Sequence, residues 1–236
     1  MIATLKNKRE IAINTTLFEL TLEQEINFKA GQFFFSKLID SETTMASDLT
    51  RHFSFVNPPE DNKIIEFATR ISDSDFKQKL NNLNIGSPIE ITGPAGKFIL
   101  PTNASELIMI AGGIGITPFI SQLRHIQNQQ LDYKIKLLHF NTNQTTAPFY
   151  DTLQKFNQIL KNFSFVPIMS ENKNWSGETG YINQDIIQKY SQHFSEPFFL
   201  VVGPPPMIKN TLLSLKELAI SESRILTEEF TGYTNY

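Results

Sequence analysis

The stretch Ile108-Met109-Ile110-Ala111-Gly112-Gly113-Ile114-Gly115-Ile116-Thr117-Pro118 joins an apolar run, a glycine-rich turn and a helix start. The run has no polar position for a solvated face, so it predicts a parallel strand buried on both sides, whose carboxyl end meets ligand. The glycines allow a tight turn close to a phosphate, Thr117 can cap the next helix, and Pro118 suits its first turn. A helix amino terminus here would offer N–H groups to an anion.

This turn departs from the usual dinucleotide fingerprint. Read as G-x-G-x-x-P, it lacks the last glycine, and no acid ends the next strand, where His139-Phe140-Asn141-Thr142-Asn143 stand. A purely structural turn is therefore the alternative interpretation.

Composition restricts the function classes. The chain has 236 residues, enough for two modest domains or one large one, with 40% hydrophobic residues and a net charge of −3. That charge gives no basic surface for nucleic acid. The absence of cysteine excludes disulfides, thiolate zinc sites and iron–sulfur clusters, so redox chemistry would need a bound organic cofactor.

Targeting and metal signals are not apparent. The amino terminus lacks the apolar core of a signal peptide, and no window reaches the about 18 apolar residues of a membrane span. We therefore expect a cytoplasmic protein with no membrane span. The four histidines have no ligand spacing among them, and we expect no metal site.

The first hundred residues predict a small antiparallel β-barrel. Large apolar residues alternate with charged ones in Ile65–Ile71, which is the period of a strand with one buried face. Strands are predicted at 15–22, 32–38, 52–57, 63–71 and 88–92. A helix is predicted at 75–83, with Ser74 as its cap.

The second half predicts an α/β domain with a five-stranded parallel sheet, because apolar strands alternate with helical patterns. Strands are expected at 106–111, 134–140, 163–169, 197–202 and 224–229. Helices are expected at 118–130, 147–161, 184–190 and 205–219. The boundary falls near Leu100-Pro101-Thr102-Asn103, which predicts a barrel domain at 1–100 and an α/β domain at 101–236.

Two further stretches carry chemistry. In Arg51-His52-Phe53-Ser54, strand alternation puts Arg51 and Phe53 on one face and His52 and Ser54 on the other. A cation, an aromatic ring and a hydroxyl suit a flavin nucleotide, although a surface charge and a core ring are the structural alternative. The strand Phe198–Val202 leads into Gly203-Pro204-Pro205-Pro206-Met207, where ligands bind in a wound sheet, although the prolines could merely stiffen a loop.

In this order the motifs resemble those of the ferredoxin:NADP reductase family. The matching segments are Arg51-His52-Phe53-Ser54, Gly93-Pro94-Ala95-Gly96-Lys97-Phe98, Gly112-Gly113-Ile114-Gly115-Ile116-Thr117-Pro118, Gly203-Pro204-Pro205-Pro206-Met207 and Glu228-Glu229-Phe230. They span essentially the whole chain. The resemblance implies FAD, less so FMN, and NADH or NADPH as co-substrate. It also implies that residues 1–100 form the flavin-binding barrel domain and residues 101–236 the NAD(P)-binding domain.

The resemblance also implies residue roles. Arg51 would pair with the flavin pyrophosphate, Phe53 would pack on the flavin, and Ser54 would hydrogen-bond flavin N5, the atom that accepts hydride from nicotinamide C4. The other implied flavin-binding residues are His52, Thr69, Arg70, Ser74, Lys77 and Phe230. The implied dinucleotide-binding residues are Gly112, Gly113, Gly115, Thr117, Pro118, Gly203, Pro204 and Met207. Ser54 and Glu229 are the catalytic candidates.

Three departures limit this transfer. Val202 stands where many members have a cysteine, and Ser74-Asp75-Phe76-Lys77 replaces the second flavin-phosphate motif, Gly-x-x-Ser. The chain also has no cysteines for an iron–sulfur centre of its own, so the electron acceptor must be separate.

The leading hypothesis is an FAD-containing NAD(P)H reductase that passes electrons to a ferredoxin, a flavodoxin, an oxygenase component or a small molecule. The alternatives are a flavin reductase that uses free flavin as substrate and a non-catalytic redox sensor. NADH is favoured because Asn141–Gln144 supplies no cation for a 2′-phosphate, although Lys173 could reach it. The resemblance implies that the carboxyl-terminal tail folds back over the flavin through Tyr233 or Tyr236, and a frayed terminus is the alternative.

Overall fold

The computed structural model describes residues 1–39, 50–172 and 174–230. By its contacts the chain divides into two compact units. Unit 1 contains Met1–Leu100 and Thr117–Asn128, and unit 2 contains Pro101–Ile116 and the chain from Gln129 onward. Each unit is described by itself.

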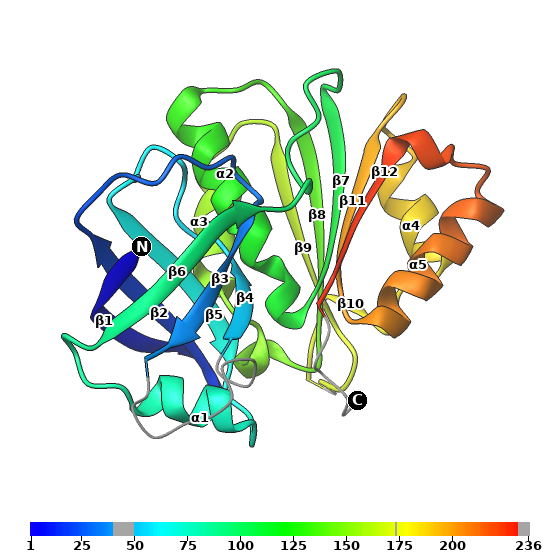
Figure 1. Ribbon diagram of the computed structural model, residues 1–236. Coiled ribbons are helices and arrows are strands. Elements are labelled where there is room, and N and C mark those ends of the chain that lie inside the picture. The colour runs from blue at the N-terminus through cyan, green and yellow to red at the C-terminus, as the bar shows by residue number, and fades with distance from the viewer. Residues whose placement is uncertain (40–49, 173, 231–236) are drawn as a thin grey trace. The chain divides into compact units, whose positions relative to one another are not determined.

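Unit 1 is built on a six-stranded antiparallel sheet with the order β4-β3-β6-β1-β2-β5 (Figure 1). Its strands are β1 (Ile2–Ala12), β2 (Thr15–Leu22), β3 (Phe33–Leu38), β4 (Thr50–Ser54), β5 (Ile64–Arg70) and β6 (Pro88–Ala95). Just after β4, the N–H of Val56 donates to the carbonyl of Glu66 on β5 at 2.7 Å, which links the two ends of the sheet order. The sheet is therefore barrel-like, as predicted.

The barrel core is unusually aromatic. Phe18 stacks on Phe67 with ring centroids 5.1 Å apart, and Phe34 meets Phe67 edge-on at 5.6 Å. Helix α1 (Asp75–Asn82) adds Phe76 and Leu80 to this core and lies at one end of the strands (Figure 1). The alternation predicted for β5 holds at Ile65 and Phe67, which are buried, but Ala68 is buried as well.

Strand β1 was not predicted. Its sequence is mostly polar, and only Ala3 and Leu5 are buried among its eleven residues. Register shifts interrupt its pairing with β2 between Leu5 and Asn7 and again between Glu10 and Ala12. Each shift changes which side chains face the core, so the strand shows no period of two.

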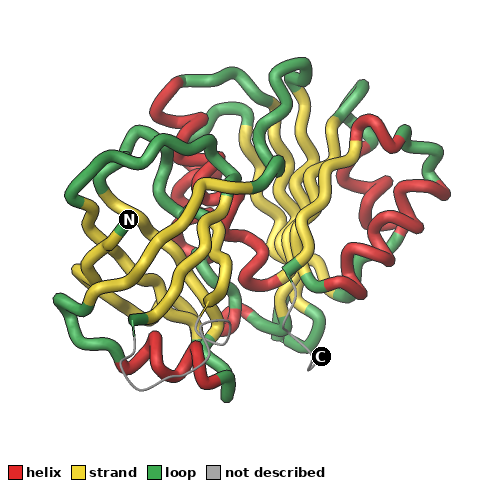
Figure 2. The backbone as a smooth tube through the Cα atoms, in the orientation of Figure 1, coloured by secondary structure: helices red, strands yellow, loops and turns green. Residues whose placement is uncertain are grey.

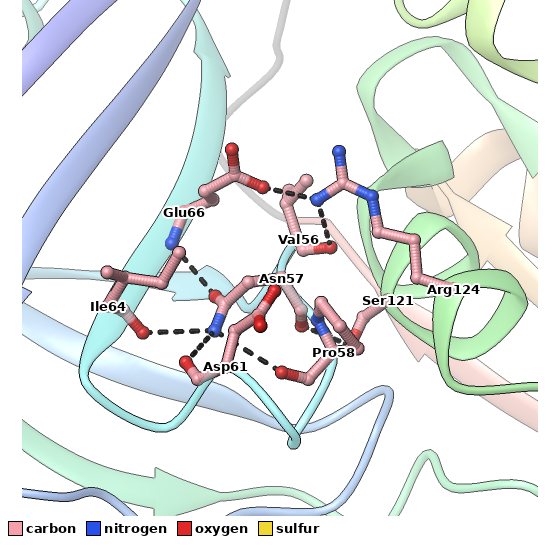
Figure 3. Close-up of polar contacts among 8 residues, drawn as sticks. All are labelled: Val56, Asn57, Pro58, Asp61, Ile64, Glu66, Ser121 and Arg124. Carbon is pink, nitrogen blue, oxygen red and sulfur yellow. Dashed lines mark hydrogen bonds and ion pairs between the residues drawn. The ribbon is translucent and has the colours of Figure 1, made fainter. Parts of the chain in front are cut away.

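Helix α2 (Thr117–Gln129) follows the glycine turn, and hydrogen bonds join it to the barrel of unit 1 (Figure 3). The hydroxyl of Ser121 donates to the carbonyl of Asn57 at 2.8 Å. Arg124 pairs with Glu66 and donates to the carbonyl of Val56 at 3.1 Å.

The Asn57 side chain holds the barrel end of this network. Its amide nitrogen donates to the carbonyls of Asp61 and Ile64 at 3.0 Å each, and its amide oxygen accepts from the N–H of Glu66 at 2.8 Å (Figure 3). One buried side chain thus ties the loop between β4 and β5 into the conformation that meets α2.

Unit 2 is built on a six-stranded parallel sheet with the order β10-β9-β8-β7-β11-β12, drawn in yellow in Figure 2. The strands are β7 (Glu106–Gly112), β8 (Lys134–Asn141), β9 (Phe163–Met169), β10 (Glu178–Thr179), β11 (Phe198–Gly203) and β12 (Ile225–Glu229). The predicted sheet had five strands, so one strand, β10, was missed. Strand β10 has only two residues, too few to show a hydrophobic period.

Helices cover both faces of this sheet (Figure 1). Helices α4 (Gln184–Ser191) and α5 (Pro205–Glu217) share a core with Ile108 and Ile110 of β7. Helix α3 (Tyr150–Ile159) lies on the other face, where Phe156 meets Phe163 edge-on. The short 3₁₀ turns are η2 (Gly113–Ile116), η3 (Gln144–Thr146) and η4 (Glu222–Arg224).

Candidate functional site

Three cations from separate elements of unit 1 gather near one another. The guanidinium carbon of Arg51 on β4 lies 5.4 Å from the ring centre of Phe76 on α1. Burial, together with the charges of Arg51 and Arg70, lowers the pKa of Lys77 on α1 to about 8. A phosphate bound among these cations would relieve their mutual repulsion. The residues therefore fit a flavin phosphate, and the sequence had named all three.

Ser74 occupies the N-cap position of α1, but its side chain makes no capping hydrogen bond, so that part of the prediction was wrong. Only its carbonyl takes part, by accepting from the N–H of Gln78 at 3.0 Å. The first-turn N–H groups of α1, beside Lys77, are therefore not covered by the Ser74 hydroxyl.

Strand β4 shows the predicted alternation. Phe53, 8% exposed, packs on Phe67 with centroids 4.7 Å apart, whereas His52 meets Phe33 at 5.3 Å. Burial and the charge of Arg51 lower the pKa of His52. Phe53 is thus mainly a core ring, so a flavin could contact only its small exposed part.

Ser54 and Thr69 differ in what their hydroxyls do. Ser54 is 4% exposed, and its hydroxyl makes no hydrogen bond to any residue in 1–39, 50–172 or 174–230. Thr69 is buried, and its hydroxyl lies 3.5 Å from the carbonyl of Arg70. Ser54 therefore keeps a hydroxyl for a ligand, and the flavin role of Thr69 stays a prediction.

In unit 2 the helical run after β7 begins before the helix that was predicted at 118–130. Strand β7 ends at Gly112, and η2 runs from Gly113 to Ile116 directly into α2. Thr117 is therefore the first residue of α2 and not its cap, and Pro118 is the second. Gly113, the first residue of η2, has a φ of 53°, a left-handed backbone conformation that favours glycine.

The other glycines here are explained by packing between strand ends. A Cβ on Gly112 would collide with the sulfur of Met207, and one on Gly115 would lie 2.8 Å from the carbonyl oxygen of Val202. A Cβ on Gly203 would lie 3.0 Å from the same sulfur. These glycines let β7, β11 and the start of α5 approach closely, a requirement that does not depend on a phosphate.

Pro204 and Phe230 flank the same end of β11. Pro204 takes the N-cap position of α5, and its carbonyl accepts from the N–H of Ile208 at 3.1 Å. The N–H of Phe230 donates to the carbonyl of Gly203 at 3.0 Å. The predicted dinucleotide residues Gly203, Pro204 and Met207 therefore lie together at one strand end.

The two neighbouring acids of β12 differ. Glu229 is exposed, whereas one carboxylate oxygen of Glu228 is buried without a hydrogen-bond partner among the described residues. Burial raises the pKa of Glu228 to about 7. The catalytic role of Glu229 stays a prediction. The motif spacing, Glu-x-aromatic counted back from Phe230, could have identified Glu228.

Sequence reasoning also missed a polar pair on β8. His139 is 0% exposed, and its Nε2 lies 2.9 Å from the carbonyl oxygen of Gly113. Asn141 is 8% exposed, and neither polar atom of its amide has a partner in the described structure. The only available signal was a pair of polar residues, His139 and Asn141, next to the apolar run of the same strand.

Other predictions have local explanations or lie outside the described residues. Trp175 donates from its indole nitrogen to the carbonyl of Glu178 at 3.0 Å and packs against Gly177, which is local packing. Lys173 and the tail residues Tyr233 and Tyr236 lie outside the described residues. Across 1–39, 50–172 and 174–230, no group of His, Asp and Glu side chains is placed to hold a metal ion. None of the helices described has the length and hydropathy needed to cross a membrane.

Comparisons with known proteins match both units. Residues 2–99 match the model of the oxidoreductase FAD-binding domain, and residues 109–212 match that of the oxidoreductase NAD-binding domain. The anthranilate 1,2-dioxygenase electron transfer component of Acinetobacter baylyi is 27% identical, over 97% of this chain and 67% of its own length. The chain spans about half to two thirds of the length of the curated relatives it matches.

Solved structures share the fold. The cytochrome P450 reductase GcoB of Amycolatopsis has a TM-score of 0.85 at 23% identity, covering 98% of this chain and 69% of that one. A ferredoxin NADP⁺ reductase from Neisseria gonorrhoeae, with bound FAD and NADP, has a TM-score of 0.84 at 20% identity, covering 97% and 98%. With matching domain models that together cover most of the chain, the protein belongs to the oxidoreductases that combine an FAD-binding and an NAD-binding domain, and it shares the fold of ferredoxin NADP⁺ reductase.

Proposed function

We propose that the protein is an FAD-containing reductase that oxidises NAD(P)H and passes electrons to a separate acceptor. The flavin would bind residues 1–100 and the dinucleotide residues 101–236. The main support is the gathering of Arg51, Arg70 and Lys77, which the charge of a flavin phosphate would complement. When bound, the cofactors supply the chemistry, with nicotinamide C4 giving a hydride to flavin N5.

The residues of this chain would bind the two cofactors and orient them. Arg51 and Lys77 would hold the flavin phosphates by charge-assisted hydrogen bonds, and the Ser54 hydroxyl would bond to the flavin ring. The turn at Gly113–Ile116 presents backbone N–H groups to the dinucleotide diphosphate. Glu228, whose pKa is raised to about 7, can hold or release a proton at its buried oxygen near neutral pH.

The acceptor is proposed from the relatives. One is an electron transfer component of anthranilate 1,2-dioxygenase, and another is the reductase component DmpP of phenol 2-monooxygenase from a Pseudomonas species. This chain has no cysteine to ligate an iron–sulfur cluster, so the next carrier would be another protein, such as an oxygenase component, a ferredoxin or a flavodoxin, or a small molecule. We propose a cytoplasmic location.

The test is the absorption spectrum of the purified protein, followed under nitrogen after NADH or NADPH is added. The proposal expects flavin bound near one per chain and rapid bleaching. Protein that purifies without flavin but reduces added FMN or FAD would be a flavin reductase. Bound flavin that neither coenzyme bleaches would support a redox sensor and contradict the proposal.

A further inference from the structure

His139 is an unusual residue for its place in the sheet. Strand β8 lies between β7 and β9. The two residues before His139 on this strand, Leu137 and Leu138, are fully buried and apolar. His139 is buried as completely, yet it brings two polar ring nitrogens into this interior. A polar group in such a place normally has a hydrogen-bond partner.

Only one of the two nitrogens has a partner. The Nε2 atom lies 2.9 Å from the carbonyl oxygen of Gly113, whereas Nδ1 has none within the described residues. A carbonyl oxygen only accepts, so Nε2 must carry the proton. Burial lowers the pKa of His139 to about 4, so the ring is neutral at physiological pH and Nδ1 is a bare acceptor.

The bonded carbonyl belongs to the first residue of the glycine turn. Gly113 has a φ of 53°, in the left-handed region, and begins η2. Because a trans peptide is planar, the Gly113 carbonyl and the Ile114 N–H of the same peptide point in opposite directions. A hydrogen bond that holds the Gly113 oxygen against β8 therefore fixes the plane of the Gly113–Ile114 peptide and the direction in which the turn faces.

We propose that His139 is a positioning residue for the dinucleotide: by holding the Gly113 carbonyl, it fixes the turn at Gly113–Ile116 in the conformation that receives the diphosphate. This inference rests on the proposed function. It explains why a strand interior contains a histidine with an unpaired nitrogen. An apolar side chain would pack there without that defect, but it would leave the turn without its bond to β8.

The test uses His139→Phe in the full-length chain, with NAD⁺ and ADP-ribose as probes and calorimetry as the measurement. Phenylalanine keeps a ring of similar size and removes both nitrogens. Loss of one positioning hydrogen bond should weaken both Kd values by up to about tenfold. The Tm should change little, because the variant removes the unpaired Nδ1 but leaves the Gly113 carbonyl without its donor. A merely structural histidine would instead lower the Tm and leave affinity unchanged.

Two variants complete the design. The His139→Gln side chain can donate to the same carbonyl, so it should restore most of the affinity even if His139→Phe folds poorly. Phe165→Leu is the packing control, since its ring centroid lies 6.5 Å from that of His139. It should lower the Tm without changing either Kd. Unchanged affinity in His139→Phe, or no rescue by His139→Gln, would overturn this inference and leave the proposed function standing. A wild-type protein that binds neither probe would overturn the proposed function as well.

Discussion

The ionisation of Glu228 leads to a measurable pH dependence. Its pKa is raised from 4.5 to about 7 because burial penalises the charged carboxylate. The folded protein therefore binds this proton more tightly than the unfolded chain does. The resulting stabilisation is fully present below pH 4.5 and is lost as the pH rises through about 7.

The size of the effect follows from the shift. A difference of one pH unit in pKa corresponds to about 1.4 kcal/mol, so a change from 4.5 to about 7 corresponds to about 3 kcal/mol. The free energy of unfolding should fall by roughly this amount from pH 4 to pH 8 because of Glu228. Glu228→Gln cannot ionise, so its stability should lack this component.

The assay is urea unfolding of both proteins between pH 4 and pH 8. The stability of the wild type relative to Glu228→Gln should decrease across this range, with its midpoint between the two pKa values. Glu229→Gln is the matched control, because the adjacent acid is exposed. A wild-type-minus-variant difference that stays constant from pH 4 to pH 8 would refute the reasoning.

Three other predictions concern the proposed cofactor sites. Arg51→Ala should lower flavin retention about tenfold or more through loss of a charge-assisted bond, whereas Ser54→Ala should retain flavin but reduce it about 10- to 100-fold more slowly in stopped flow. Wild-type flavin content in Arg51→Ala, or unchanged reduction in Ser54→Ala, would contradict these roles. Gly115→Ala should cost about 1–3 kcal/mol of stability, measured by urea unfolding, because its Cβ would lie 2.8 Å from the Val202 oxygen. NADH should have the higher kcat/KM because Asn141–Gln144 has no cation, and a clear preference for NADPH would show that another segment reads the ribose.

The sequence predicted the elements with strong hydrophobic periods and missed those without one. Strands β2 and β9 have the predicted bounds, because their apolar residues define them. Strand β1 is mostly polar and interrupted by register shifts, and β10 has two residues, so neither has a pattern to detect. The start of α2 was misplaced because η2 precedes it without a break.

The candidate site was predictable where residues follow one another in the chain. The alternation on β4 and the cations at Arg51 and Lys77 could be named from the sequence, but their proximity depends on how α1 packs. The bond from His139 on β8 to Gly113 in η2 joins residues 26 positions apart in the chain. Spacing in a single sequence carries no information about such a contact.

The network around Asn57 also constrains the order in which the chain can fold. Unit 1 includes Thr117–Asn128, and the Asn57 carbonyl and Glu66 receive their bonds from Ser121 and Arg124. During synthesis the barrel strands are all complete by Ala95, yet these partners leave the ribosome only later, after part of unit 2. The contacts between α2 and the barrel can therefore form only after a segment that follows the last barrel strand has been synthesised. In a nascent chain that stops before Ser121, the loop between β4 and β5 lacks these contacts.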